Sequence, residues 1–119
     1  MDKILKQALL YDFYGELLTE HQKSIYEDFV LNDYSLSEIG EDRNISRQGV
    51  YDIIKRCDRL LNGYEEKLHL IQKFLMAKEQ VAQIHSYAGE ILKNNCTQEK
   101  TTEYLRQIEN ISNNILEDM

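Results

Sequence analysis

The chain has 119 residues, of which 14 are basic and 21 acidic, so its formal net charge is −7. This length suits one domain or a small domain with an appendage, and the 42% apolar content excludes a chain that is disordered throughout. Proline is absent and only five glycines occur, which favours a nearly all-helical chain because both residues disrupt helix interiors.

The first 18 residues carry Asp2, Asp12 and Glu16. A signal peptide needs a basic start and an uncharged apolar run, so we expect none here. No stretch approaches the roughly 18 apolar residues of a membrane span. We therefore expect a soluble, cytoplasmic protein without membrane insertion. Two cysteines, Cys57 and Cys96, are too few for a disulfide framework, and both are expected to be reduced.

Two helices are predicted before residue 35. The first covers residues 3–17, because apolar residues recur every four positions, with Leu10 and Tyr14 widening a stripe made of Leu5, Leu9, Phe13 and Leu17. Thr19 followed by Gln22 has the spacing of a capping box and predicts the start of the second helix. Its inward residues are expected to be Ile25, Phe29 and Val30. A turn at Asn32 and Asp33 should end it.

The stretch SLSEIGEDRNISRQGVYDIIKRC, residues 35–57, predicts a short helix, a turn and a longer helix. Ser35 and Glu38 form a second capping box, and this short helix should stop by Arg43. Asn44 suits the left-handed conformation that such a turn needs. Ser46 then caps the next helix. The shared core of this helix-turn-helix is predicted to be Leu36, Ile39, Ile45, Val50 and Ile53.

The helix that begins at Ser46 has two different faces. Its apolar stripe is Val50, Ile53, Ile54, Cys57 and Leu61, and residues 46–61 carry a local net charge of +2, from four basic and two acidic side chains. In DNA-binding helix-turn-helix proteins, the first turns of this helix enter the major groove. The nucleic-acid-binding residues are therefore predicted to be Ser46, Arg47, Gln48, Tyr51, Lys55, Arg56 and Arg59.

A heptad seam favours one long helix from Ser46 to about residue 74, despite Asn62-Gly63. Its apolar residues step by fours and threes: Cys57, Leu61, Tyr64, Leu68, Ile71 and Leu75. From Val81 the stripe changes phase, which predicts a bend within 74–80. After a loop at 94–97, Thr97 should cap a last helix. We expect a helix-turn-helix domain at 1–66 and a helical tail at 67–119.

The seams of the tail suit either a single-chain hairpin or pairing between two chains. A hairpin of two or three helices has little core of its own, so a homodimer is expected. Its predicted interface is Leu68, Ile71, Leu75, Ile84, Ile91, Leu105, Ile108 and Ile115.

Enzyme chemistry finds little support. The three histidines are scattered, no glycine-rich phosphate loop occurs and the cysteines lack metal-ligand spacing. We therefore expect no catalytic residues, no metal site and no cofactor.

The run SRQGVYDIIKR followed by YEEKLHL, within residues 10–75, resembles the YlxM-like family of small bacterial proteins. The helix-turn-helix also resembles region 4 of bacterial sigma factors, which reads promoter DNA. These resemblances imply an all-α, sigma-region-4-like fold, a long helix leading into a helical hairpin or coiled-coil-like tail, and a dimer. They also imply a regulatory role in the signal recognition particle pathway. Gly49, Tyr51 and Asp52 stand where sigma factors tend to place arginine, arginine and glutamine, and Arg43 where a leucine is usual.

Two functions follow. The first is a non-enzymatic, dimeric regulator that binds DNA or structured RNA through the helix after Ser46. The alternative is an acidic adaptor that binds the signal recognition particle protein, or another protein, without nucleic acid. An acidic body attracts a basic partner, and tyrosines are enriched at interfaces. Those expected for the adaptor are Tyr11, Tyr14, Tyr26, Tyr34 and Tyr51.

Overall fold

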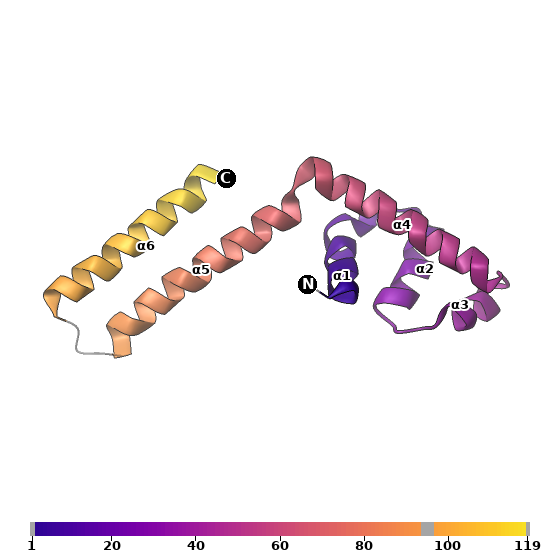
Figure 1. Cartoon of the computed structure of the whole chain (residues 1–119), viewed down its shortest axis with the longest axis horizontal. Helices are drawn as coiled ribbons and strands as arrows, with labels where there is room; N and C mark the ends of the chain where they lie inside the picture. The colour runs from indigo at the N-terminus through magenta and orange to yellow at the C-terminus, as the bar shows by residue number, and fades with distance from the viewer. Residues whose placement is uncertain (1, 94–96, 119) are drawn as a thin grey trace. The chain divides into compact units, whose positions relative to one another are not determined.

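The computed structural model describes residues 2–93 and 97–118, whose regular elements are all helices. The chain divides into two compact units, Met1–Ile71 and Gln72–Met119. In chain order (Figure 1) the elements are α1 (Lys3–Tyr14), the 3-10 turn η1 (Gly15–Leu17), α2 (Glu20–Val30), α3 (Leu36–Arg43), α4 (Arg47–Leu68), α5 (Leu70–Lys93) and α6 (Gln98–Asp118). Within the described ranges, no helix combines the length and apolar composition needed for a membrane span.

The predicted caps are confirmed. Thr19 with Gln22 and Ser35 with Glu38 both form complete capping boxes at the starts of α2 and α3. The Ser46 hydroxyl accepts the Gly49 N–H at 3.0 Å at the start of α4. α3 ends at Arg43, and Asn44 is left-handed, with φ 58° and ψ 44°. Local hydrogen bonding of short polar side chains therefore sets these helix boundaries.

A close approach at the helix-turn-helix corner requires glycine at position 40. A Cβ there would lie 2.5 Å from the backbone oxygen of Ile45, which is too near for any side chain. The Gly40 carbonyl accepts the N–H of Ile45 at 2.9 Å, so the chain after α3 folds back tightly onto it. This turn fixes the direction in which α4 leaves.

The core of the first unit joins α1, α2, α3 and α4. It contains all of the predicted helix-turn-helix core, with Ile39 and Val50 fully buried and Leu36, Ile45 and Ile53 partly buried against them. The predicted stripe of α1 meets the core only through its middle residues, Leu9 and Phe13, which are partly buried. Leu5 and Leu17 are exposed, whereas the widening residues Leu10 and Tyr14 are 2% exposed. Tyr11 and Leu18 are also buried, so the inward face lies to one side of the four-residue repeat.

Three buried tyrosines hold the unit together through carboxylates. The Tyr26 hydroxyl donates to Asp58 at 2.6 Å, and Tyr14 donates to Glu65 at 2.5 Å. Tyr11 donates to Glu27. Each hydroxyl thus satisfies its hydrogen-bonding requirement inside the unit, as burial demands. The tyrosines expected at a protein interface are core residues in these three cases.

The long helix ends earlier than predicted, at Leu68 rather than near residue 74. His69 adopts φ 56° and ψ 28°, a left-handed conformation, and α5 begins at the next residue. The Tyr14 hydroxyl accepts the N–H of Leu70 at 3.2 Å, and a Glu65 carboxylate oxygen accepts the N–H of Ile71 at 3.0 Å. These two side chains cap the start of α5 and stabilise the break. The bend predicted within 74–80 is therefore wrong, since α5 runs through it.

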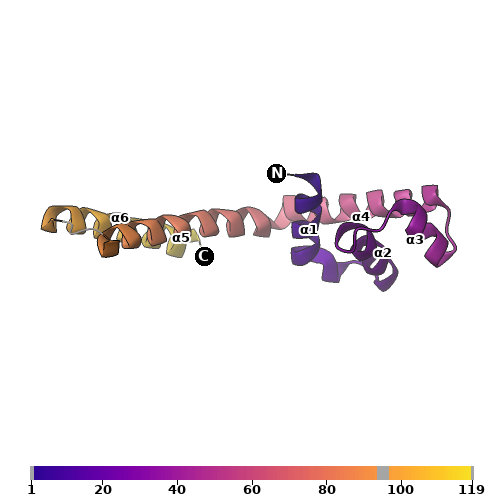
Figure 2. The same cartoon turned by 90° about the horizontal axis from the view of Figure 1, so that it is seen from below.

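The second unit is a helical hairpin. α5 and α6 run antiparallel beside one another (Figures 1 and 2), and the rings of Tyr87 and Tyr104 lie 5.7 Å apart. Thr97 caps α6, since its hydroxyl accepts the Lys100 N–H at 3.2 Å. Residues 94–96 of the loop predicted at 94–97, including Cys96, lie outside the described residues. An all-α fold with a helix-turn-helix and a helical tail is thus confirmed.

The predicted dimer residues differ in exposure. Leu68, Leu75 and Leu105 are exposed, by 49%, 37% and 54%. Ile71 is already buried in the core of the first unit. The remaining four are partly buried: Ile84, Ile91, Ile108 and Ile115. The exposed leucines leave apolar surface on the chain.

We predict that Tyr14→Phe lowers the free energy of unfolding by about 1–2 kcal/mol, because it removes the hydrogen bonds to Glu65 and Leu70. Urea denaturation measures the change. Hydrogen exchange at the Leu70 amide should also accelerate. Tyr34→Phe is the matched control, since Tyr34 is 41% exposed. Equal losses in both variants would contradict a capping role for Tyr14.

We also predict that the protein loses stability as pH rises above about 10. Burial, and then hydrogen bonds to Glu27 and Asp58, raise the pKa of Tyr11 and Tyr26 well above the usual value of 10.0. Stability from a raised pKa is fully present below the unfolded value and is lost as pH rises through it towards the folded value. Tyr26→Phe should flatten this loss in urea midpoints measured from neutral to alkaline pH. A slope equal to that of the wild type would contradict the prediction.

Candidate nucleic-acid interface

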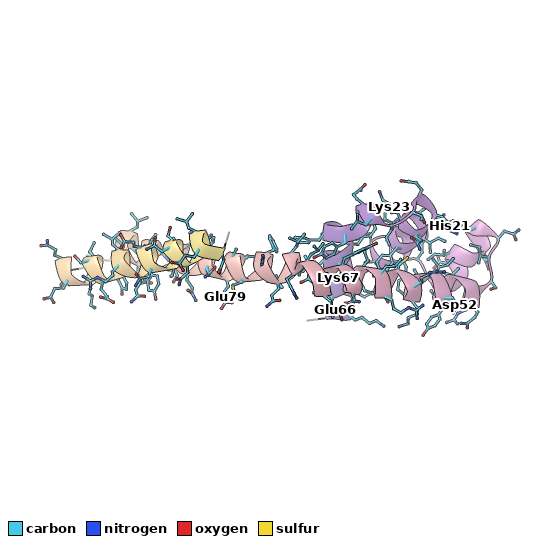
Figure 3. All side chains as sticks on the ribbon, turned by 90° about the horizontal axis from the view of Figure 1, so that it is seen from above. His21, Lys23, Asp52, Glu66, Lys67 and Glu79 are labelled. Carbon is cyan, nitrogen blue, oxygen red and sulfur yellow. The ribbon has the colours of Figure 1, made fainter. Side chains whose placement is uncertain are left out.

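One face of α4 builds the core and the opposite face is open. Val50, Ile54, Cys57 and Leu61 are buried at spacings of three and four, which turns them towards α1, α2 and α3. Figure 2 shows α4 running along the other three helices. In Figure 3, Asp52 and Glu66 lie along the edge of α4 that faces away from α1, α2 and α3. We call this the outer face of α4.

The predicted nucleic-acid-binding residues all lie on α4 or at its N-cap. Lys55 is partly buried, and the others, Ser46, Arg47, Gln48, Tyr51, Arg56 and Arg59, are exposed. The hydroxyl of Ser46 is engaged in capping, so its role is to start the helix. The helix-turn-helix thus brings these residues together, and a shallow groove runs past several of them.

None of the cations of this face forms an ion pair with a residue in the described part of the chain. Among the residues that the structure describes, salt bridges involve Lys23, Arg43 and Arg106 only. Arg47, Lys55, Arg56 and Arg59 are therefore available to an anionic ligand. Phosphate groups of nucleic acids are such ligands, and their neutralisation provides most of the affinity of DNA-binding proteins.

Arg43 belongs to the fold rather than to the site. Its guanidinium donates to Asp28 and to Ser24, both at 2.7 Å, and so ties α3 to α2. The same contact lowers the pKa of the Asp28 carboxyl. Arg43 stands where a leucine is usual in the sigma-factor pattern, and in this chain it links the two helices through an ion pair and a hydrogen bond.

The two acids of the local sequence have different environments. Asp58 accepts the Tyr26 hydroxyl and the Gln7 amide, at 2.6 and 3.0 Å, and is thus engaged by α1 and α2. Asp52 lies on the outer face and accepts the Gln48 amide at 3.0 Å. Sequence reasoning counted both equally in the local charge of +2. The signal that separates them is the helical spacing, since Asp58 follows the buried Cys57.

Two local features shape the first turns of α4: a contact between Lys55 and Tyr51, and the close packing of Gly49 against Ile45. The Lys55 ammonium lies 5.5 Å from the centroid of the Tyr51 ring, within cation–π range. At Gly49, a Cβ would lie 2.8 Å from the Ile45 side chain, so the tight turn favours glycine. A larger residue at this position, such as the arginine that sigma factors tend to have there, would require the Ile45 side chain to shift.

Groove residues that sequence reasoning did not select are Asn62, Gly63 and Glu66. They lie up to two turns of α4 beyond Arg59, outside the first turns of the helix, which are the turns that enter the major groove in known complexes. Their spacing of three and four residues from Arg59 and from one another is visible in the sequence.

Comparison with known proteins identifies the family. A family model described as "Putative helix-turn-helix protein, YlxM / p13 like" matches residues 1–105. A UPF0122 protein of Acetivibrio thermocellus is 55% identical over 84 residues, covering 71% of this chain and 72% of that protein. One of Thermoanaerobacter sp. is 44% identical over 116 residues, or 98% and 96%. One of Listeria monocytogenes serotype 4b is 39% identical over 110 residues, or 92% and 97%.

The matches span nearly the whole length of the Thermoanaerobacter and Listeria proteins and include the helix-turn-helix. The chain therefore belongs to the UPF0122 family of YlxM / p13-like helix-turn-helix proteins.

Proposed function

We propose that this protein is a non-enzymatic regulator that binds double-stranded DNA through the outer face of α4. The observation that carries the proposal is a set of four cations on that face that have no ion-pair partner within the described residues: Arg47, Lys55, Arg56 and Arg59. They lie on the second helix of a helix-turn-helix, which is the element that enters the major groove in known complexes. Gln48 can bond an adenine edge and Arg47 a guanine edge or a phosphate.

DNA is favoured over duplex RNA for a geometric reason. The major groove of B-DNA admits an α-helix, whereas that of A-form RNA is too deep and narrow for side chains to read. The association with the signal recognition particle comes from the family resemblance and would place a structured RNA or a particle protein nearby. Structured RNA is accordingly a separate arm of the binding test.

Modest, salt-sensitive affinity is expected. The net charge of −7 opposes approach to a polyanion, while the cations of α4 attract it locally. Weak binding outside preferred sites suits a regulator that must reject most DNA.

The tail is proposed to pair two chains through Leu68, Leu75, Ile84, Ile91, Leu105, Ile108 and Ile115. The exposed leucines support this, because pairing would remove their apolar surface from water. A dimer would present two α4 helices to two half-sites roughly 34 Å apart on one face of the DNA.

We predict that Arg47→Ala with Arg56→Ala weakens binding to a DNA duplex and flattens its salt dependence. Each phosphate contact contributes about 0.9 to the slope of log affinity against log salt, so the slope should fall by about 2. Fluorescence anisotropy over a salt series measures both quantities, with a structured RNA hairpin as the second ligand.

The matched control is Lys73→Ala with Lys78→Ala. These lysines are exposed on α5, and the double substitution changes the net charge by the same amount. Equal weakening by both variants would show that the overall charge matters and α4 does not. Tighter binding to the RNA hairpin than to any duplex would replace DNA by RNA as the ligand.

We predict that Leu105→Glu shifts the protein from dimer towards monomer in sedimentation equilibrium, since it places a charge in the proposed interface. Leu92→Glu is the control, because Leu92 is 86% exposed and lies outside the predicted seam. A wild-type protein that is monomeric at every concentration would contradict pairing by the tail, as would equal effects of the two variants.

The alternative function, an adaptor that binds a protein partner, is less well supported, because most of the tyrosines expected at its interface are buried. Tyr11, Tyr14 and Tyr26 are buried with their hydroxyls bonded to carboxylates, so only Tyr34 and Tyr51 of the five are exposed. Binding of a basic partner such as the signal recognition particle protein, with no retention of duplex or RNA at low salt, would favour the adaptor instead.

A further inference from the structure

The proposed DNA-binding face carries one carboxylate that the fold does not explain. Of the acids in the first four turns of α4, Asp58 is bonded to Tyr26 and Gln7. Among the residues that the structure describes, the one hydrogen-bond partner of the Asp52 carboxylate is Gln48, which lies one turn earlier on the same face of α4. Figure 3 shows Asp52 on the edge of α4 that faces away from the core.

A carboxylate at this place opposes phosphate binding, because it adds negative charge beside cations of the same face: Asp52 lines one shallow groove with Lys55 and Arg59 and a second with Arg56 and Arg59. A face selected for phosphate contact alone would favour a neutral or basic residue there. Base edges differ from phosphates in offering donors. Cytosine presents its N4 amine in the major groove, and aspartate or glutamate accepts from it.

The Gln48–Asp52 hydrogen bond prepares the pair for such contacts. One N–H of the Gln48 amide donates to Asp52 at 3.0 Å, which leaves the second N–H and the amide oxygen for a base. The Asp52 carboxylate keeps further lone pairs as acceptors. Fixing both side chains in advance lowers the conformational entropy lost on binding.

We propose that Asp52 is a specificity-determining residue that selects cytosine and rejects guanine at the base pair it faces, with Gln48 holding it in place. Guanine offers only the N7 and O6 acceptors on its major-groove edge, and these repel a carboxylate. This inference rests on the proposed function, since it assigns a role within the same DNA-binding face. Asp52 thereby weakens binding to most sequences and strengthens discrimination among them.

The experiment uses the full chain and a library of DNA duplexes with random central base pairs. Wild-type protein, Asp52→Asn and Glu66→Gln are each used to retain duplexes at low salt, and the retained pools are sequenced. Glu66 is the matched control, because it is exposed on the same edge of α4 and loses the same charge (Figure 3). Circular dichroism checks that each variant keeps the helical fold.

Wild-type protein should prefer cytosine to guanine about 5-fold or more at one position, the lower range for a single base contact. Asp52→Asn should shift that preference towards adenine, which asparagine reads, and raise retention of the unselected pool. Glu66→Gln should leave the preference unchanged. If Asp52→Asn and Glu66→Gln both raise retention without changing base preference, Asp52 is only a repelling charge and the inference fails. Retention of no duplex by the wild type would overturn the proposed function as well.

Discussion

The first unit depends on the hydrogen bonds that Asp58 accepts from Tyr26 and Gln7. They join α4 to α2 and α1 at one point, and the Tyr26 ring that supplies the hydroxyl is fully buried. A buried phenol needs such a partner, and a carboxylate is a strong acceptor in a poorly solvated site. The orientation of α4, and hence which residues face outward, follows from this contact together with the apolar stripe.

Other acidic side chains are also engaged in hydrogen bonds within the fold, which makes the proposed DNA-binding face compatible with an acidic chain. Four acidic side chains accept hydrogen bonds within the first unit. Glu27 accepts from Tyr11, Asp28 from Arg43, and Glu38 from the backbone N–H of Ser35. Asp58 accepts from Tyr26 and Gln7. Much of the negative charge near α4 therefore stabilises the fold. The cations of the outer face have no carboxylate partners among the described residues. The segment 46–61 is therefore locally basic, although the chain as a whole is acidic.

The boundaries of α2 and α3 and the start of α4 were predictable because caps are local. Ser35, Asn44 and Ser46 act on residues within a few positions, which a reader of the sequence can see. The end of α4 was not predictable in this way. It depends on Tyr14, which is 56 residues from Leu70 in the chain, and the continuous heptad pattern favoured an unbroken helix. The burial of Tyr11 and Tyr26 was missed for the same reason, because their carboxylate partners, Glu27 and Asp58, lie 16 and 32 residues away in the chain.

For the candidate site, the sequence predicted which residues gather on α4 but not which of them are already engaged. That division between Asp52 and Asp58 decides the charge of the face. The most direct test is an amide chemical-shift titration of isotopically labelled protein with a DNA duplex at low salt. Shifts concentrated in residues 46–59, and weaker at raised salt, are expected if α4 contacts DNA. Shifts absent from α4, or confined to α5 and α6, would contradict it.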